Sequence, residues 1–116
     1  KAMVICFGTG NTTGTVSLFP GVQVDGIEID KNVLSLAHHF SKWNHNSQKK
    51  KNIHMYIQDG RTFTRWTQNK YDVITLEPMS PIQAGTVNLY SREFYQLTAE
   101  RLNKDGLMMQ WLPLHL

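Results

Sequence analysis

The feature that most constrains the fold of this chain is its opening, where an apolar strand runs into a glycine loop and a second strand ends in a carboxylate. Residues 2–7 are apolar in succession, and Gly8-Thr9-Gly10 follows them directly. Glu28 ends the next apolar segment, eighteen residues after Gly10. This order is typical of a parallel α/β sheet that binds a nucleoside, because glycines let the backbone approach the ligand and a carboxylate accepts hydrogen bonds from ribose hydroxyls.

The rest of the chain continues as an alternation of strands and helices. Five apolar segments are predicted to be strands, with four helical segments between them: the strands are 2–7, 22–29, 53–57, 71–76 and 107–112. Right-handed crossovers between such strands give an α/β, doubly wound, mainly parallel sheet. Because the chain has 116 residues and no internal repeat, we expect one domain over residues 1–116.

Two helices have predicted ends. Asp30 is expected to cap a helix that turns a stripe of four side chains toward the sheet, namely Val33, Leu36, Ala37 and Phe40. The last helix is expected to stop in the segment 103–106, where Gly106 can adopt the left-handed conformation.

Composition argues against two classes of partner. The formal charge is +3, and the three consecutive lysines at 49–51 account for the whole excess within a polar segment. Such a run is typical of a solvated loop, whereas a nucleic-acid surface spreads cations and aromatic side chains over one face. No apolar run approaches the roughly 20 residues of a membrane span. We therefore expect this segment to contact neither nucleic acid nor membrane.

The lone cysteine and the two chain ends predict the setting of the domain. Cys6 has no partner for an intrachain disulfide, which fits a reducing, cytoplasmic compartment. The chain opens on Lys1 and stops soon after its fifth predicted strand, so we expect a fragment of a longer chain. The apolar fifth strand would then be covered by a second copy, in a homo-oligomer, or by the remainder of that chain.

Four strand ends in succession carry a glycine turn or a carboxylate: Gly8 and Gly10, then Glu28, then Asp59 with Gly60, then Glu77. Loops after parallel strands meet at one edge of the sheet, so these residues predict a nucleoside site there. Each of these residues also has a purely structural alternative to ligand binding; Asp59, for example, can cap a helix. Threonine at position 13 departs from the dinucleotide pattern G-x-G-x-x-G, and Thr15 stands where a P-loop needs lysine.

These residues resemble the Rossmann-type S-adenosylmethionine-binding enzymes, and among them the spermidine synthase family. The resemblance covers nearly the whole chain. It is carried by the segments Phe7-Gly8-Thr9-Gly10, Gly26-Ile27-Glu28-Ile29-Asp30, Gln58-Asp59-Gly60-Arg61, Tyr71-Asp72-Val73-Ile74 and Leu89-Tyr90-Ser91-Arg92-Glu93-Phe94-Tyr95.

The resemblance implies a site for S-adenosylmethionine or decarboxylated S-adenosylmethionine, bound as substrate, and no metal. Glu28 would bind the ribose hydroxyls and Asp59 the adenine amino group. The nucleoside-binding set implied by the resemblance is Gly8, Thr9, Gly10, Glu28, Ile29, Asp59 and Gly60. Carboxylates suit this task because they accept hydrogen bonds and favour a sulfonium cation.

The resemblance also implies aminopropyl transfer to a small-molecule amine. In spermidine synthases, a D-x-x-D-P stretch follows strand four; its first aspartate acts as the base and its second helps to hold the diamine. This chain has Glu77-Pro78-Met79-Ser80-Pro81 there. Glu77 is then the catalytic base, with Ser80 and Tyr90 as substrate-binding residues. Ser80 is neutral and cannot replace a carboxylate that pairs with an ammonium group, so putrescine is not specified as the acceptor.

Two other functions remain open at this point. Methyl transfer relies on alignment more than on a base, so an S-adenosylmethionine-dependent methyltransferase would tolerate the change at Ser80. A non-catalytic nucleoside-binding module would keep the fold and give Glu77 no chemical task. The stretch 77–90 is also similar to spermidine synthase-like domains of longer bacterial proteins, some with membrane segments, which implies that the parent protein can be membrane-tethered.

Overall fold

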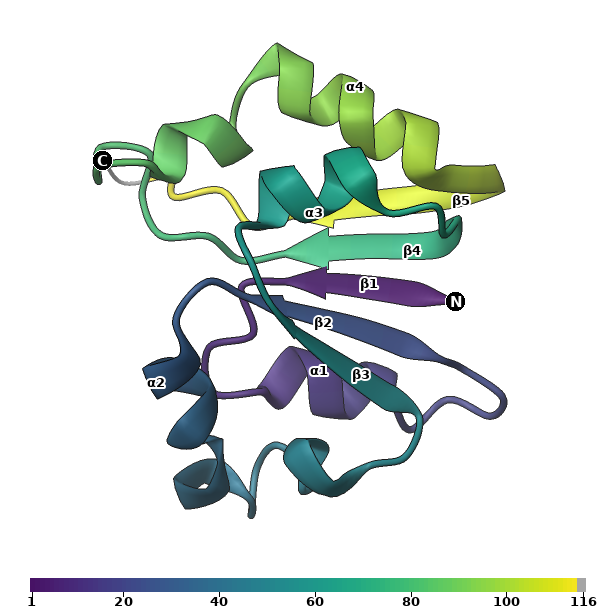
Figure 1. Ribbon diagram of the computed structural model, residues 1–116, viewed down its shortest axis with the longest axis vertical. Helices are drawn as coiled ribbons and strands as arrows, with labels where there is room; N and C mark the ends of the chain where they lie inside the picture. The colour runs from purple at the N-terminus through teal and green to yellow at the C-terminus, as the bar shows by residue number, and fades with distance from the viewer. Residues whose placement is uncertain (115–116) are drawn as a thin grey trace.

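The computed structural model describes residues 1–114 as helices packed on one five-stranded sheet (Figure 1). The strands are β1 (Ala2–Ile5), β2 (Val24–Glu28), β3 (Ile53–Ile57), β4 (Tyr71–Leu76) and β5 (Leu102–Gln110). The α-helices are α1 (Asn11–Val16), α2 (Lys31–Ser35), α3 (Gly60–Trp66) and α4 (Arg92–Arg101). Three 3-10 turns complete the series: η1 (Ala37–Phe40), η2 (Ser47–Lys49) and η3 (Thr86–Leu89).

The strand order is β3-β2-β1-β4-β5, and every neighbouring pair runs parallel. The chain first builds outward from β1 to β3, and then returns to β4 on the other side of β1. The predicted doubly wound parallel sheet is therefore confirmed. None of the helices in residues 1–114 is long and apolar enough to cross a membrane.

Each face of the sheet has its own core. Right-handed crossovers toward β3 place α1 on one face, and those toward β5 place α3 and α4 on the other. Under α3 and α4 lies the larger buried cluster, which includes Met3, Ile5, Ile27, Ile74, Leu76 and Phe94. Under α1 lies a smaller cluster of Ala2, Val4 and Val24. Alternation along β1 thus sends successive side chains into the two cores.

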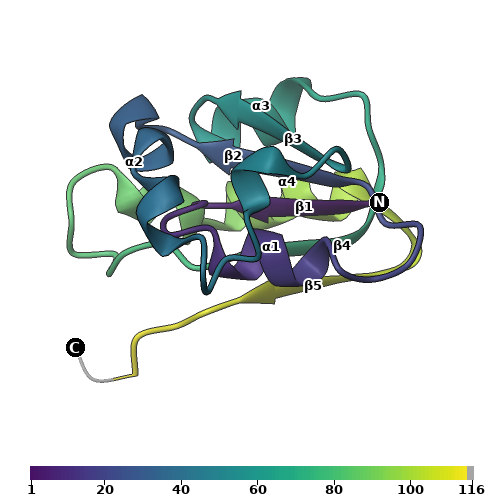
Figure 2. The ribbon, with the colours of Figure 1, turned by 90° about the horizontal axis from the view of Figure 1, so that it is seen from below.

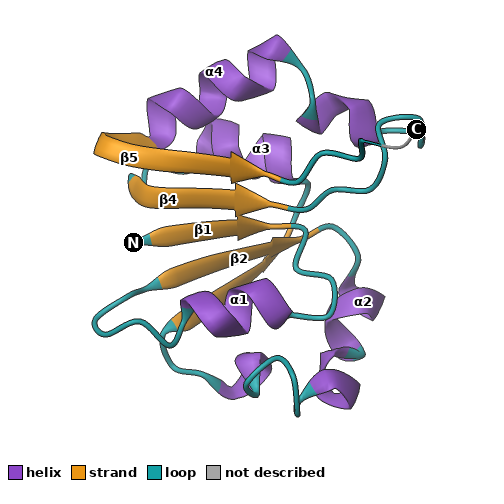
Figure 3. Cartoon of the chain, turned by 180° about the vertical axis from the view of Figure 1, so that it is seen from behind, coloured by secondary structure: helices purple, strands orange, loops and turns teal. Residues whose placement is uncertain are grey.

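One part of the sheet carries no helix. On the α1 face, Val73 of β4 pairs with Leu107 of β5, and Leu107 and Met109 are 70% and 63% exposed. Figure 3 shows this face with α1 in front of the sheet and no helix in front of β4 and β5. In Figure 2, β5 lies at the rim of the molecule and the chain after it runs away from the sheet. The apolar face of β5 is therefore open to solvent in this chain.

A buried carboxylate ties the amino ends of the strands together. Asp25 of β2 is fully buried, and its Oδ2 accepts hydrogen bonds from the Tyr71 hydroxyl at 2.6 Å and from Asn69 Nδ2 at 3.2 Å. Lys1 Nζ lies 3.3 Å from the same oxygen. Burial, followed by the contact with Asp25, raises the pKa of Tyr71. This network links β2 to β4 across β1 at the edge opposite the glycine loop.

The helix predicted after Asp30 is shorter than expected. Asp30 does cap α2, accepting a hydrogen bond from Asn32 N at 2.8 Å. However, α2 ends at Ser35 and a 3-10 turn follows, so that Leu36 is 52% exposed and the predicted stripe does not face the sheet as a unit. The backbone oxygen of Ala37 accepts a hydrogen bond from the buried Asn44 side chain at 2.9 Å, which replaces continued helical pairing.

The end of α4 also differs from the prediction. The helix stops at Arg101, and β5 begins at once with Leu102. Asp105, not Gly106, takes the left-handed conformation, with φ of 65°. The register between β4 and β5 shifts there, from Tyr71 opposite Leu102 to Val73 opposite Leu107. This bulge absorbs the residues that were expected to form the helix end.

Gly14 provides a test of how α1 is seated. A Cβ at this position would lie 1.9 Å from the backbone oxygen of Asn44, which is fully buried. We predict that Gly14→Ala lowers the free energy of unfolding by about 1–3 kcal/mol, because backbone must move to admit the methyl group. Thr15→Ala, at an exposed position of the same helix, is the matched control. Equal stability of the two variants in urea unfolding would contradict this packing.

Candidate functional site

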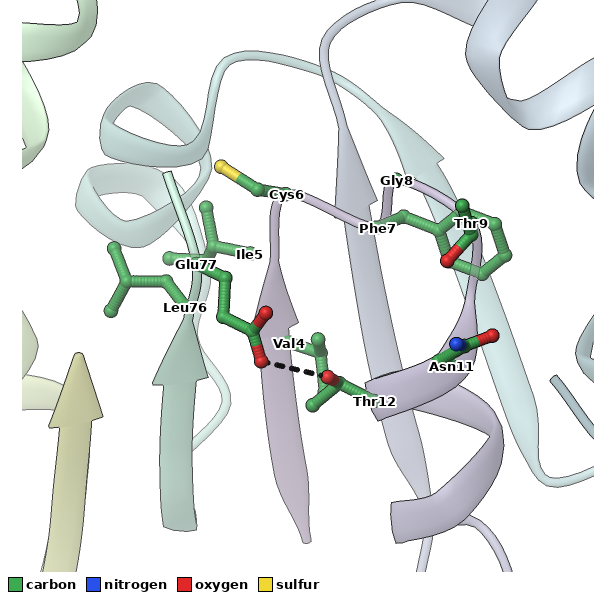
Figure 4. Close-up of a pocket in the computed structure, with 10 residues that line it drawn as sticks. All are labelled: Val4, Ile5, Cys6, Phe7, Gly8, Thr9, Asn11, Thr12, Leu76 and Glu77. Carbon is green, nitrogen blue, oxygen red and sulfur yellow. Dashed lines mark hydrogen bonds between the residues drawn. The ribbon is translucent and has the colours of Figure 1, made fainter. Parts of the chain in front are cut away.

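A pocket of about 200 Å³ lies where the strand order reverses, between the carboxyl ends of β1 and β4 (Figure 4). Its walls come from the end of β1 and the loop after it, from the first turn of α1, and from the end of β4. Ligands of open α/β sheets bind at this point because the crossovers leave β1 and β4 in opposite directions and their loops part.

The glycine loop has the tight backbone that the sequence predicts. Gly10 has φ of 86°, and a Cβ on it would lie 2.6 Å from the Phe7 ring and 2.7 Å from Ser47 Oγ. Gly10 N donates to the backbone oxygen of Phe7 at 2.9 Å, which closes the turn. Gly8 and Thr9 are exposed and line the pocket. Gly10 itself is buried and lies outside the lining, so the loop reaches the cavity through Phe7, Gly8 and Thr9.

Glu28 connects the loops that follow β1 and β2. Its side chain is buried, its Oε2 accepts a hydrogen bond from Gly8 N at 3.1 Å, and its Oε1 accepts one from Asp30 N at 3.1 Å. Each carboxylate oxygen can accept a further hydrogen bond. Glu28 stands behind Gly8 and does not itself line the pocket. It thus holds the glycine loop in place and keeps capacity to accept further hydrogen bonds.

The remaining predicted nucleoside-binding residues lie at the next strand ends. Ile29 is 68% exposed beside Glu28. Asp59 caps α3, accepting a hydrogen bond on Oδ2 from Thr62 N at 2.8 Å. The alternative role predicted for Asp59, that of a helix cap, is therefore present. Gly60 is buried against Ile5, whose Cγ2 would lie 2.4 Å from an added Cβ. None of these three lines the pocket.

Cys6 is a pocket residue that the sequence pattern did not single out. It follows β1 with φ of 67°, a rare value for a residue that is not glycine, and it lines the cavity (Figure 4). Burial, then the charges of Glu28 and Asp59, raise the pKa of the thiol to about 12. The thiol is therefore neutral near pH 7, chiefly because the protein buries it.

Glu77 lies on the β4 side of the pocket. Its Oε1 accepts a hydrogen bond from the Thr12 hydroxyl at 3.0 Å, shown as the dashed line in Figure 4. Of the ten described residues that line the cavity, only Glu77 carries a charge. Asn11 and Thr12 also line the cavity, and neither was predicted. No spacing rule points to them, because α1 meets β4 only in the folded chain.

Ser80 and Tyr90 lie outside the pocket lining. The Tyr90 hydroxyl donates to the backbone oxygen of Met79 at 3.2 Å and so braces the loop after β4. Ser80 Oγ is buried without a hydrogen-bond partner among residues 1–114. The described residues also hold no group of three His, Cys, Asp or Glu side chains that could bind a metal ion.

Comparison with known proteins identifies the family. The family model described as the spermine/spermidine synthase domain matches residues 1–111. The chain belongs to the spermine/spermidine synthase family. The resemblance inferred from the sequence motifs is thereby confirmed.

Curated relatives in this family include polyamine aminopropyltransferases. The one from Alkaliphilus oremlandii is 28% identical over 110 residues, which cover 94% of this chain and 38% of the relative. The one from Saccharolobus solfataricus is 31% identical over 109 residues, which cover 91% of this chain and 36% of the relative. The chain therefore spans well under half the length of these relatives.

Solved structures show the same fold. A spermidine synthase in complex with the transition-state analogue AdoDATO superposes with a TM-score of 0.84 at 25% identity, covering 92% of this chain and 37% of that one. The human methyltransferase-like protein 13 in complex with SAH gives a TM-score of 0.72 at 20% identity, covering 92% of this chain and 51% of that one. The second likeness concerns the fold alone.

We predict that Glu28→Ala weakens the binding of methylthioadenosine, a probe of the predicted nucleoside site, about 10- to 100-fold, because it removes hydrogen bonds to a charged acceptor worth about 1.5–3 kcal/mol. The substitution also frees Gly8 N and Asp30 N, so the glycine loop loses its anchor. Calorimetric titration of the full-length protein measures the change. Glu93→Ala, at an exposed position on α4, is the control. A folded Glu28→Ala protein with unchanged affinity would exclude Glu28 from the site.

Proposed function

We propose that the full-length protein transfers an aminopropyl group from decarboxylated S-adenosylmethionine to an amine at this pocket. The observation that carries the proposal is the position of Glu77, the one charged residue of the described lining, opposite the glycine loop. Membership of the spermine/spermidine synthase family supports the same reaction.

Charge favours the decarboxylated ligand over S-adenosylmethionine itself. Decarboxylated S-adenosylmethionine carries a sulfonium and an ammonium group, whereas S-adenosylmethionine adds a carboxylate. The described lining offers that carboxylate no cation and one like charge, Glu77. Two unit charges about 4 Å apart interact by about 4 kcal/mol at an effective dielectric of 20. A pocket of this charge therefore suits a cationic tail.

The nucleoside would be held by the strand ends that the sequence singled out. Gly8, Thr9 and Gly10 would present backbone to it, and Glu28 would accept from the ribose hydroxyls with the lone pairs left by its two backbone donors. Asp59 would meet the adenine amino group with Oδ1, since Oδ2 caps α3. Ile29 would flank the adenosine with its apolar side chain. Gly60 would flank it with backbone that carries no side chain.

Glu77 would act as the general base. The acceptor enters as an ammonium ion and gives one proton to the Glu77 carboxylate. The free amine then attacks the carbon beside sulfur, so that an N–C bond forms as the C–S bond breaks. The electron pair of that bond stays on sulfur, which neutralises the sulfonium, and methylthioadenosine leaves. The new secondary amine keeps the positive charge as its ammonium form.

The residues predicted to bind the acceptor favour an amine other than a diamine such as putrescine. Ser80 would lie near the acceptor with a neutral hydroxyl that lacks a partner among residues 1–114, and Tyr90 would hold the loop that carries both Glu77 and Ser80. A neutral hydroxyl can donate to or accept from an amine but does not pair with a second ammonium charge. We therefore infer a small amine whose second cationic group is not required.

The setting of the domain is part of the proposal. A single cysteine in the sequence supports a reducing compartment, and we place the domain in the cytoplasm. We also propose that the free edge of β5 and its open face, with Leu107 and Met109, are covered in the working protein by a second copy or by further chain.

Hydrogen exchange of the full-length protein tests this cover. We predict slow exchange for the β5 amides that do not pair with β4, because a covered edge strand has little access to water. Exchange of the β5 edge amides at the rate of an unstructured peptide would contradict the cover.

Turnover tests the reaction itself. Full-length protein is incubated with decarboxylated S-adenosylmethionine and a panel of mono- and diamines, and methylthioadenosine release is measured. We predict that Glu77→Gln lowers kcat by at least about 100-fold, because the base is lost, and leaves methylthioadenosine affinity within about threefold. Glu93→Gln is the control.

Three outcomes would contradict the proposal. Full activity in Glu77→Gln would remove the base. Formation of S-adenosylhomocysteine from S-adenosylmethionine, without methylthioadenosine, would assign the site to methyl transfer. Nucleoside binding without either turnover would indicate a non-catalytic module.

A further inference from the structure

The Thr12 side chain reaches across the pocket to Glu77. Thr12 lies in the first turn of α1, is half-buried, and donates its hydroxyl to Glu77 Oε1 at 3.0 Å (Figure 4). The two residues are 65 positions apart in the sequence. Among residues 1–114 this is the one hydrogen bond recorded for the Glu77 side chain.

The fold makes this contact possible because β1 and β4 are neighbours in register, with Ile5 opposite Leu76. Glu77, the first residue after β4, therefore lies next to the point where the chain leaves β1. The tight turn at Gly8 and Gly10 then brings the first turn of α1 back beside the end of β4. Thr12 reaches Glu77 from this turn, and so the contact depends on the glycine loop.

A glutamate at an exposed strand end has several rotamers of similar energy, and only some of them point its carboxylate at a given ligand atom. Thr12 can reduce this freedom. Its β-branched side chain is largely restricted to two χ1 rotamers in a helix, and in the one present here its hydroxyl donates to Glu77. A threonine in a helix can instead bond the carbonyl one turn before it, but here the hydroxyl is given to Glu77.

We propose that Thr12 is a positioning residue for Glu77: it holds one carboxylate oxygen so that the other is available to take the proton from the acceptor amine. The inference rests on the proposed function of Glu77 as base. It adds a residue of α1 to a task that the sequence motif confines to the loop after β4. Thr12 touches neither reacting atom in this account and acts through Glu77.

Two substitutions separate the hydroxyl from the shape of the side chain. Thr12→Val keeps the volume and removes the donor, and Thr12→Ser keeps the donor. In the full-length protein we expect Thr12→Val to lower kcat about 10- to 100-fold with the KM for the nucleoside within about threefold, because a displaced base costs rate more than binding. Thr12→Ser should restore most of kcat. Thr15→Val, exposed on the same helix, is the control.

A double-mutant cycle distinguishes positioning from a structural role. In a Glu77→Gln background, Thr12→Val should lower the residual turnover by less than about twofold, because the base it positions is already gone. An equal loss in both backgrounds would overturn the proposal. So would a Thr12→Ser variant that fails as badly as Thr12→Val.

A crystal structure of the Thr12→Val protein gives a readout that needs no activity. We expect the Glu77 carboxylate to leave its position beside α1 or to occupy several rotamers. An unchanged single rotamer would overturn the proposal whether or not the protein turns over. If Glu77 moves and the wild-type protein transfers no aminopropyl group, the positioning contact stands and the proposed reaction fails.

Discussion

The reversal of strand order beside β1 is the constraint on which the rest of the site depends. Right-handed crossovers carry the chain from β1 toward β3 on one face and from β3 back to β4 and β5 on the other. The loops after β1 and β4 must therefore separate, and the pocket lies between them. No local sequence signal creates this opening. It is a consequence of parallel pairing and of the hand of the connections.

Two carboxylates at the strand ends around that opening differ in their surroundings. Glu28 is buried and bound to two backbone donors, so it fixes the glycine loop and is a stationary acceptor. Glu77 is exposed and accepts a hydrogen bond from one side-chain hydroxyl, so it can accept a proton from a solvated amine. In our proposal, the same residue type thus serves binding at one strand end and chemistry at another.

Much of the fold follows from local pattern, and much of the site does not. The apolar strands, the glycine loop and the caps at Asp30 and Asp59 were predictable because each depends on neighbours in sequence. The early end of α2 was missed because Asn44, which bonds the Ala37 carbonyl, lies beyond the helix. Thr12 was missed for the same reason, since its partner is 65 residues away.

The central claim is that the charge of this pocket selects a nucleoside without a carboxylate. Calorimetric titration of the full-length protein with decarboxylated S-adenosylmethionine and with S-adenosylmethionine, in wild type and in Glu77→Gln, tests it directly. We predict that wild type binds the decarboxylated ligand at least tenfold more tightly, a difference of about 1.4 kcal/mol, and that Glu77→Gln narrows this preference. Equal or tighter binding of S-adenosylmethionine by the wild-type protein would contradict the claim.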